Sequence, residues 1–180
     1  YRNHLYKVSF NVKGGTSVTA QYIEEGYLAE EPTIEHISCI GYTFDSWNYD
    51  VTKPIAQNET VTASWTPNTN TAYKVEYYLE NLNRDGYDLI AEETENLVGT
   101  TDTTVYAEQK TFTHFTFNSS KSKISGNIDG DGSLVLKVYY ARDTYTISTT
   151  VSNAKGGTVT VGGTYPYGTD IKFSATVNAG

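Results

Sequence analysis

The sequence predicts a mostly β chain made of small repeated modules. The tetrapeptide Lys-Gly-Gly-Thr occurs twice, at Lys13–Thr16 and Lys155–Thr158. Strand-like segments open at Tyr6, Tyr73 and Tyr145, and this spacing of roughly 70 residues indicates an array that reuses one unit. Abundant threonine and the 16 tyrosines suit half-buried sheet surfaces, and no segment has the apolar spacing of a long amphipathic helix. Arrays of this kind set distance or valency more often than they carry catalysis.

A first module is predicted over residues 6–67, after residues 1–5, which resemble the tail of a preceding module or a linker. Its opening strand, Tyr6–Val12, places Tyr6, Val8, Phe10 and Val12 on one face. Gly14-Gly15 then supplies the positive φ of a tight turn. The elements predicted after this turn are a return strand (Val18–Ile23), a break (Glu24–Gly26), a loop or short helical turn (Pro32–His36), an aromatic strand (Gly41–Trp47) and a closing strand (Val61–Trp65). In the aromatic strand, Tyr42, Phe44 and Trp47 are expected to face inward.

A short linker at residues 68–71 leads into a second module over residues 72–142. Hairpin turns are predicted at Asn83–Gly86 and Asp129–Gly132. The strands predicted for this module are Tyr73–Leu79, Tyr87–Glu95, Thr103–Ala107, Phe112–Phe117 and Leu134–Tyr140. In the last strand Leu134, Leu136, Val138 and Tyr140 share one face, and Val135, Lys137 and Tyr139 share the other.

Residues 143–180 are predicted to form a partial third module. Its Lys-Gly-Gly-Thr is expected to form a hairpin turn between the first two strands, as in the first module. Gly26 and Gly168 each stand twelve residues after the first glycine of their copy, which strengthens the repeat. The third module lacks the aromatic strand of the first, so that either the sequence stops early or this module belongs to a shorter variant. We expect the chain to be a segment of a longer polypeptide.

Composition narrows the classes of partner. The net charge is −8 and the pI about 4.8, with lysine and arginine scattered, which disfavours nucleic acid and anionic membranes as partners. No apolar run is long enough to span a bilayer, so membrane insertion is not expected. The single cysteine, Cys39, allows no internal disulfide and is expected to be a small buried apolar residue.

The residues with chemical potential do not form a catalytic or metal-binding pattern. His4, His36 and His114 lie in different segments without a second ligand at metal-binding spacing, and His114 is expected on the strand face opposite Phe115. Asn127–Ser133 resembles the start of a calcium loop, but that motif needs a terminal acid, and the corresponding positions hold valine or tyrosine. We therefore interpret it as a hairpin turn and leave weak calcium binding open.

Two further arrangements of charged residues have ordinary explanations. Glu24-Glu25 and Glu30-Glu31 are interpreted as a solvated face, because a glycosidase needs two acids facing each other across a cleft. Lys7 and Lys74 lie on the polar phase of their strands, which disfavours an intramolecular isopeptide bond. No catalytic, cofactor-binding or metal-binding residue is assigned, binding residues are left unknown, no cofactor is expected, and the chain is not expected to be an enzyme.

The motifs of the first module resemble a known family. Its opening strand, Gly14-Gly15, Gly26, Pro32 and Gly41-Tyr42-Thr43-Phe44-Asp45-Ser46-Trp47 resemble the Listeria–Bacteroides repeat, the internalin-type B-repeat, except that Ser46 stands where the family usually has glycine. Val75-Glu76-Tyr77-Tyr78 and Val138-Tyr139-Tyr140 make the second module similar to mucin-binding-protein-type repeats. The third module resembles divergent bacterial surface repeats through Gly156–Val159 and Tyr165–Thr169. The resemblance implies β-grasp-like modules in an extracellular, cell-wall-attached or secreted adhesin.

Two functional hypotheses follow. The first is a spacer: tandem β-grasp-like modules in an elongated array of a bacterial surface adhesin, contacting neighbouring repeats of the same chain and projecting a ligand-binding domain. The second is a binding module that recognises a glycan or a host surface protein through exposed aromatic side chains. Pairing of open sheet edges between chains is a further possibility that the sequence leaves open.

Overall fold

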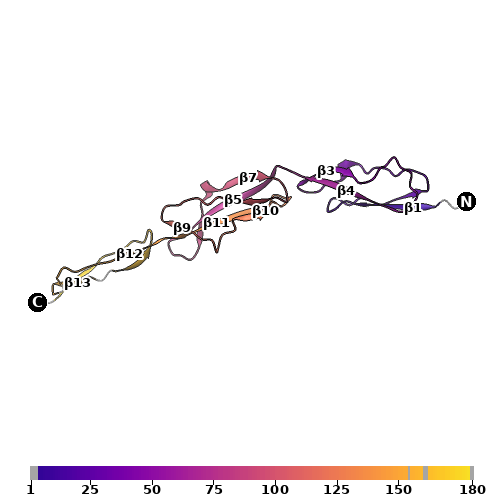
Figure 1. Cartoon of the computed structure of the whole chain (residues 1–180). Helices are drawn as coiled ribbons and strands as arrows, with labels where there is room; N and C mark the ends of the chain where they lie inside the picture. Colours follow the sequence, from indigo (N-terminus) through magenta and orange to yellow (C-terminus); the bar gives the residue numbers. More distant parts are fainter. Residues whose placement is uncertain (1–3, 154, 160–161, 179–180) are drawn as a thin grey trace. The chain divides into compact units, whose positions relative to one another are not determined.

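The computed structural model describes residues 4–153, 155–159 and 162–178, and it is mostly β (Figure 1). The chain divides into two compact units, which are described separately. The first holds Tyr1–Tyr73, Asn96–Val105 and Asn127–Leu134, and the second holds the remaining segments, Lys74–Glu95, Tyr106–Gly126 and Val135–Gly180. The predicted second module is therefore divided between the two units. The module boundaries that the sequence suggests remain a prediction.

The first unit contains a four-stranded sheet in the order β2-β1-β4-β3. Its strands are β1 (Leu5–Asn11), β2 (Gln21–Glu24), β3 (Tyr42–Trp47) and β4 (Glu59–Pro67), and a short 3-10 helix, η1 (Ile34–His36), lies in the predicted Pro32–His36 loop. The two central strands run parallel, from Val8 opposite Glu59 to Asn11 opposite Thr62. Each outer strand is antiparallel to its neighbour.

The core of this unit confirms the predicted alternation of the opening strand. Val8 is completely buried, and Tyr6, Phe10 and Val12 pack against the same cluster. The other buried members come from the loops and from β3 and β4: Ala29, Ile37, Trp47, Ile55, Val61 and Ala63.

The aromatic strand is not a regular alternation. Its pairing with β4 shifts register between Phe44 and Ser46, so that Phe44 and Trp47 both face the core with their rings 5.4 Å apart. The shift falls at Asp45, which has no partner in the β3–β4 register. Tyr42 is only half-buried and is not among the hydrophobic residues packed against this core, which corrects the expectation that it faces inward.

The first Lys-Gly-Gly-Thr turns the chain as predicted, but the positive φ values fall on Lys13 and Gly14, at 45° and 93°. Gly15 serves a different purpose, because a Cβ there would lie 2.7 Å from the Trp65 ring. The return strand is shorter and later than predicted. β2 pairs with β1 only from Leu5 to Val8, while β4 pairs with the opposite edge of β1 from Val8 to Asn11.

The second unit contains a sheet in the order β6-β5-β11-β9, with β7 (Glu95–Gly99) also pairing with β5. The ordered strands are β5 (Thr71–Glu80), β6 (Tyr87–Leu89), β9 (Phe115–Phe117) and β11 (Val135–Arg142). Here too the long central strands, β5 and β11, are parallel, from Lys74 opposite Val135 to Leu79 opposite Tyr140. A separate pair joins β8 (Thr104–Tyr106) to β10 (Ser125–Asn127), and β10 was not predicted.

Several predictions for this region were wrong in detail. The predicted strand Tyr87–Glu95 is interrupted by a 3-10 helix, η2 (Ala91–Glu93). The strand predicted over Phe112–Phe117 begins only at Phe115, because His114 has a φ of +67° and lies in a turn. Asp129–Gly132 is a turn, closed by Gly132 N–H to the Asp129 carbonyl at 2.9 Å, but β10 before it pairs with β8 and not with β11.

The two faces of β11 are as predicted. Leu134, just before the strand, and Leu136, Val138 and Tyr140 within it are at most 4% exposed. On the other face Val135 and Tyr139 are half-buried and Lys137 is exposed. Burial of this apolar row against β5 builds the core of the second unit, to which Val75 and Tyr77 also contribute.

Two buried tyrosines of this core provide a matched pair of substitutions. The Tyr77 hydroxyl donates to the Glu108 carbonyl at 3.0 Å, whereas the Tyr140 hydroxyl makes no well-aligned hydrogen bond among the described residues. Burial raises the pKa of Tyr140, and the nearby Lys110 main chain offsets this only in part. We expect Tyr77→Phe to lower the free energy of unfolding by about 1 kcal/mol and Tyr140→Phe to leave it nearly unchanged. Urea denaturation of both variants measures the difference, and a larger loss for Tyr140→Phe would contradict the assignment.

The C-terminal strands belong to the second unit and form two small ladders. β12 (Thr144–Ile147) pairs with β14 (Gly163–Pro166), and β13 (Gly157–Val159) pairs with β15 (Ala175–Val177). None of the described residues from Thr144 to Asn178 is buried. The second Lys-Gly-Gly-Thr therefore does not form the predicted hairpin turn between the first two strands, since its Gly157-Thr158 belongs to β13.

The start of this region nevertheless repeats the start of the first unit. β1 and β2 begin their ladder at Leu5 opposite Glu24, and β12 and β14 begin theirs at Thr144 opposite Pro166. In each case the residue before the first strand accepts a further backbone hydrogen bond, at 3.0 Å from Glu25 to His4 and at 2.8 Å from Tyr167 to Asp143. The glycines that follow, Gly26 and Gly168, have φ values of 87° and 85°. The sequence repeat thus corresponds to a repeated local structure.

Candidate functional site: strand junctions and a tyrosine–lysine face

The first junction joins β4 to β5 and lies in the first unit. Only residues 68–70 separate the two strands. Asn68 N–H donates to the Gly41 carbonyl, and Thr101 N–H donates to the Asn68 carbonyl, both at 2.9 Å. The Thr101 hydroxyl, 1% exposed, adds bonds to the Gly41 carbonyl at 2.8 Å and to the Thr71 hydroxyl at 2.7 Å. The predicted linker is therefore fixed by hydrogen bonds on both sides.

Two glycines bring main chains into direct contact at this junction. A Cβ on Gly41 would lie 2.2 Å from the Gly130 Cα, and a Cβ on Gly130 would lie 2.3 Å from the Ile40 carbonyl oxygen. Next to them the Tyr42 hydroxyl donates to Asp102, and this hydrogen bond raises the pKa of Tyr42. Gly41 and Tyr42, which were predicted to begin the aromatic strand, thus also form contacts that stabilise the junction.

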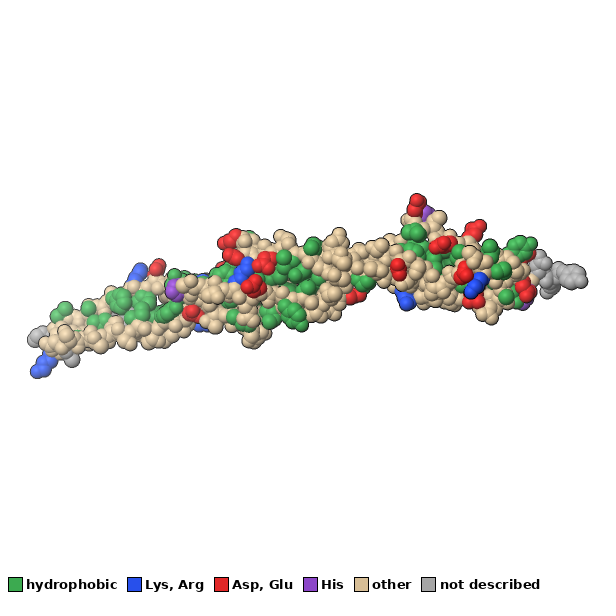
Figure 2. Space-filling model, turned by 45° about the horizontal axis from the view of Figure 1, so that its top comes forward, with side chains coloured by type: hydrophobic (Ala, Val, Ile, Leu, Met, Phe, Trp, Pro, Cys, Tyr) green, Lys and Arg blue, Asp and Glu red, His purple; other side chains and the backbone are tan. Residues whose placement is uncertain are grey.

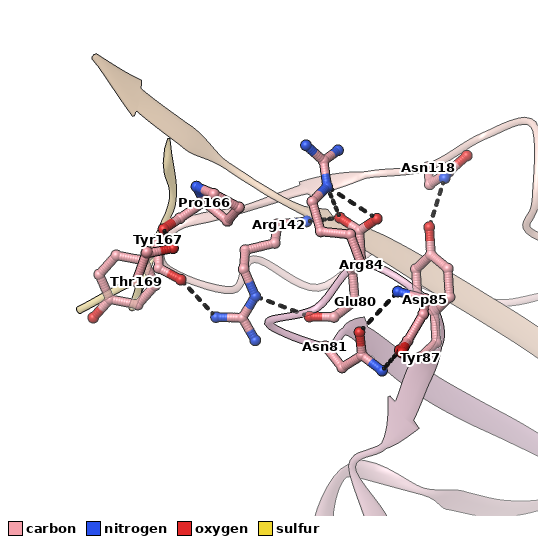
Figure 3. Close-up of polar contacts among 10 residues, drawn as sticks. All are labelled: Glu80, Asn81, Arg84, Asp85, Tyr87, Asn118, Arg142, Pro166, Tyr167 and Thr169. Atoms are coloured by element: carbon pink, nitrogen blue, oxygen red, sulfur yellow. Dashed lines mark hydrogen bonds and ion pairs between the residues drawn. The ribbon is translucent and has the colours of Figure 1, made fainter. Parts of the chain in front are cut away.

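The second junction joins β11 to β12 in the second unit, with Asp143 alone between the strands. Glu80, 8% exposed, accepts from Arg142 N–H at 2.9 Å and from Arg84 Nε at 3.4 Å (Figure 3). The Arg142 guanidinium reaches in two directions: its Nε donates to the Glu80 carbonyl at 3.1 Å, and its Nη1 donates to the Tyr167 carbonyl at 3.0 Å. Arg142 therefore ties β5 and β11 to the turn after β14.

His114 is part of this second junction. Its ring stacks on Tyr167 with centroids 3.7 Å apart, and its Nδ1 lies 2.9 Å from the Tyr145 hydroxyl. Its carbonyl accepts from Asp143 N–H at 3.0 Å. The histidine that the sequence placed on a strand face instead contacts Tyr145 in β12 and Tyr167, the residue after β14.

The other sequence candidates remain apart from one another. His4 lies 4.5 Å from the Tyr6 ring, His36 is exposed at the end of η1, and Cys39 is half-buried beside an open pocket of about 320 Å³. Within the described ranges, the ammonium groups of Lys7 and Lys74 form neither an ion pair nor a hydrogen bond; the Lys7 main-chain N–H donates to Asn58 Oδ1 at 2.8 Å.

The calcium-like segment uses its side chains in local hydrogen bonds. Asn127 Oδ1 accepts from the Thr104 hydroxyl at 2.7 Å, and Asp131 Oδ1 accepts from Ser133 N–H at 3.0 Å. Hydrogen bonds from Ser133 lower the pKa of Asp131. In the part of the chain that the structure describes, no three His, Cys, Asp or Glu side chains are grouped as metal ligands. The exposed Glu25, Glu30 and Glu31 and the half-buried Glu24 are not part of any such group either.

Sequence reasoning missed a charged cluster on the second unit. Lys110 Nζ lies 2.8 Å from both Glu93 Oε2 and Glu95 Oε1, and 4.3 Å from the centroid of the Tyr77 ring. Although burial lowers the pKa of Lys110, its hydrogen bonds to Glu93 and Glu95 outweigh that effect and raise it. The partners are far apart along the chain, and no local pattern connects them.

Two tyrosines of β5, the buried Tyr77 and the half-buried Tyr78, set an upper pH limit for the stability of the second unit. Burial raises the pKa of Tyr77 to about 12, and a hydrogen bond to Glu76 raises that of Tyr78 to about 12. The unfolded chain releases these protons near pH 10, whereas the folded chain retains them. The free energy of unfolding is therefore unaffected below about pH 10 and falls between about pH 10 and 12, by about 2 kcal/mol for Tyr77. Urea denaturation at stepped pH measures this, and Tyr77→Phe should reduce the slope; a flat profile up to pH 12 would contradict it.

Sequence reasoning also missed an aromatic surface, the tyrosine–lysine face, made by Tyr78, Tyr87, Tyr139, Lys121 and Lys137. Tyr78 and Tyr139 are paired across β5 and β11 and stack at 4.8 Å, and Tyr87 meets Tyr139 edge-on at 5.1 Å. The sequence predicted that Lys137 and Tyr139 share the outer face of β11, but it did not predict which residues of other strands lie beside them.

Charged groups elsewhere are dispersed. On the face shown in Figure 2, lysine and arginine side chains are scattered among acidic and apolar ones and form no stripe. Among the described residues no helix has the length and apolar character needed to cross a bilayer. A scan against protein-family models and a search of curated proteins found no match to this chain.

Proposed function

We propose that this chain is a load-bearing spacer segment of a bacterial cell-surface adhesin, extracellular and attached to the wall or secreted. It would consist of tandem β-grasp-like modules in an elongated array. The resemblance of the first module to the internalin-type B-repeat supports the class of protein. The arrangement of the strands supports the mechanical role, and this role rests on one observation about the long strands.

The observation is that the first and last long strands of each large sheet are parallel neighbours. In the first unit β1 and β4 share a parallel ladder from Val8 to Asn11, and in the second unit β5 and β11 share one from Lys74 to Leu79. A pull on the start of the first strand and the end of the last strand draws them past each other along their length. The ladder hydrogen bonds are then loaded together and not opened one after another.

The junctions extend this load path. A force that leaves β4 reaches β5 through residues 68–70, whose main chain is bonded to Gly41 and Thr101. A force that leaves β11 passes Asp143, where Arg142 is held by Glu80. Short, bonded connections transmit tension without first being drawn out as slack chain.

Single-molecule force spectroscopy tests the proposal, because forced unfolding reports the rate of crossing the unfolding barrier. Handles at the chain ends should give two high-force events, from the β1–β4 and β5–β11 ladders, preceded by low-force yielding of the C-terminal strands that lack buried residues. As a control, handles at His4 and Glu25 open the antiparallel β1–β2 ladder from one end. Similar forces in the two geometries would refute the load-bearing role.

Two measurements test the remaining parts. Small-angle scattering of residues 1–180 should report an elongated particle, and the profile of a single globule would contradict the array. Antibodies raised against residues 72–142 should label intact, unpermeabilised cells of the source organism, and labelling only after permeabilisation would exclude a surface location.

A further inference from the structure

The tyrosine–lysine face has the features of a small ligand site on the outer side of the β5–β11 sheet. The opposite side of the same strands is buried, with Tyr77 and Tyr140 at most 1% exposed. Tyr78, Tyr87 and Tyr139 are instead only half-buried, so their rings form an open aromatic surface. Asn118 Nδ2 donates to the Tyr87 hydroxyl at 3.0 Å, which fixes the ring at the sheet edge. The surface is therefore preorganised.

Two exposed lysines border these rings. Lys121 Nζ lies 5.0 Å from the Tyr87 centroid and 5.3 Å from the Tyr139 centroid, and Lys137 Nζ lies 5.8 Å from the Tyr78 centroid. The rings hold the ammonium groups without neutralising them. The salt bridges found among the described residues involve Lys53, Arg84 and Lys110, and neither of these two lysines. Two cations without a salt-bridge partner among the described residues therefore lie beside one aromatic surface.

The acid that lies beside Tyr78 on β5 is already engaged. Glu76 lies opposite Lys137 in the ladder, and its Oε2 accepts from the Tyr78 hydroxyl at 2.6 Å. This bond orients the Tyr78 hydroxyl, while the Tyr78 ring stacks on Tyr139 and has the Lys137 ammonium group over it. A ligand on the face thus meets aromatic rings and ammonium donors together.

We propose that the tyrosine–lysine face binds an acidic sugar residue, with the apolar face of the pyranose on the tyrosine rings and the carboxylate on Lys121 and Lys137. Tyrosine offers rigid amphipathic area suited to such stacking, and ammonium donors form their strongest hydrogen bonds with anions. This makes the general hypothesis of a binding module specific, and it does not depend on the load-bearing role.

The overall charge favours a sugar over a nucleic acid. Binding of a polyphosphate strand depends on many cationic contacts along the backbone, and an acidic protein repels it. One carboxylate per sugar needs only the two ammonium groups present. An oligonucleotide is therefore the informative rival ligand.

The test is titration of the isotope-labelled chain, residues 1–180, with tri-galacturonic acid, using neutral galactotriose as the uncharged counterpart. Amide shifts are expected around Tyr78, Tyr139 and Lys137 with the acidic trisaccharide, and about tenfold weaker binding with the neutral one. Binding should weaken further as salt is raised. Equal binding of both sugars, or no shifts near these residues, would overturn the proposal.

Variants separate the contributions of charge and stacking. The double variant Lys121→Gln, Lys137→Gln should bind tri-galacturonic acid about tenfold more weakly, whereas Lys155→Gln, an exposed lysine away from the face, should bind like the parent chain. Tyr87→Leu, on the short edge strand β6, should also weaken binding while the amide spectrum shows that the chain remains folded. An unchanged affinity in the double variant, or tighter binding of a thymidine tetranucleotide than of the sugar, would refute the assignment.

Discussion

Replacing Gly41 by alanine is expected to lower the unfolding free energy of the first unit by more than about 3 kcal/mol. Two effects add. The φ of Gly41 is +82°, a left-handed conformation that costs a residue with a Cβ about 1 kcal/mol. The new methyl would also lie 2.2 Å from the Gly130 Cα and 2.7 Å from its carbonyl oxygen, and backbone atoms cannot turn aside as a side chain can.

Gly14→Ala is the matched control for this prediction. Gly14 has a similar φ of +93°, but nothing lies within 4 Å of the position that a Cβ would take there. Its substitution should therefore cost only the conformational part, about 1 kcal/mol. Urea denaturation followed by tryptophan fluorescence reports on this unit, because Trp47 and Trp65 both belong to it. Equal losses in the two variants would show that the main-chain contact at Gly130 contributes nothing.

Glu80→Ala should lower the free energy of unfolding of the second unit by about 3 kcal/mol. The substitution leaves the half-buried Arg142 N–H without its acceptor and removes the partner of Arg84 Nε. The Arg142 guanidinium would retain its bonds to the carbonyls of Glu80 and Tyr167 and its contact with the Phe115 ring. We expect the change to release the C-terminal strands first, because Arg142 holds them through Tyr167.

Glu80→Gln separates the charge of this carboxylate from its shape. The amide oxygen can still accept from Arg142 N–H, so the loss should be smaller, about 1 kcal/mol. Hydrogen exchange of the Arg142 amide gives a second measurement: it should accelerate in Glu80→Ala and remain slow in Glu80→Gln. A Gln variant as unstable as the Ala variant would indicate that the ion pair with Arg84, and not the backbone bond, dominates.

The sequence predicted the features that depend on neighbouring residues. Alternation placed Val8 and Leu136 on buried faces, and glycine spacing identified Gly26 and Gly168, both with left-handed φ. The mostly β class followed from the same local signals. These succeed because side-chain direction in a strand and the φ freedom of glycine are set within a few residues.

Features that join distant segments could not be predicted. Nothing near Val8 indicates that β1 pairs with β2 on one edge and runs parallel to β4 on the other. Gly41 looked like the start of a strand and Gly130 like part of a turn, and only their contact shows why both lack a side chain. Lys110 and Glu93 are likewise separated by enough chain that their ion pair depends on the fold. Of the tyrosine–lysine face, the sequence predicted only that Lys137 and Tyr139 share one face of β11. The residues from other segments are brought beside them by the order of strands in the sheet.

The first junction has a consequence for how such a chain can change over generations. Most of its bonds use main-chain atoms, namely the carbonyls of Gly41 and Asn68 and the amides of Asn68 and Thr101. Every amino acid except proline supplies these groups. Sequence drift is therefore tolerated along the connection as long as the two glycines and the threonine persist. The geometry of the connection between β4 and β5 can thus outlast the identity of residues 68–70.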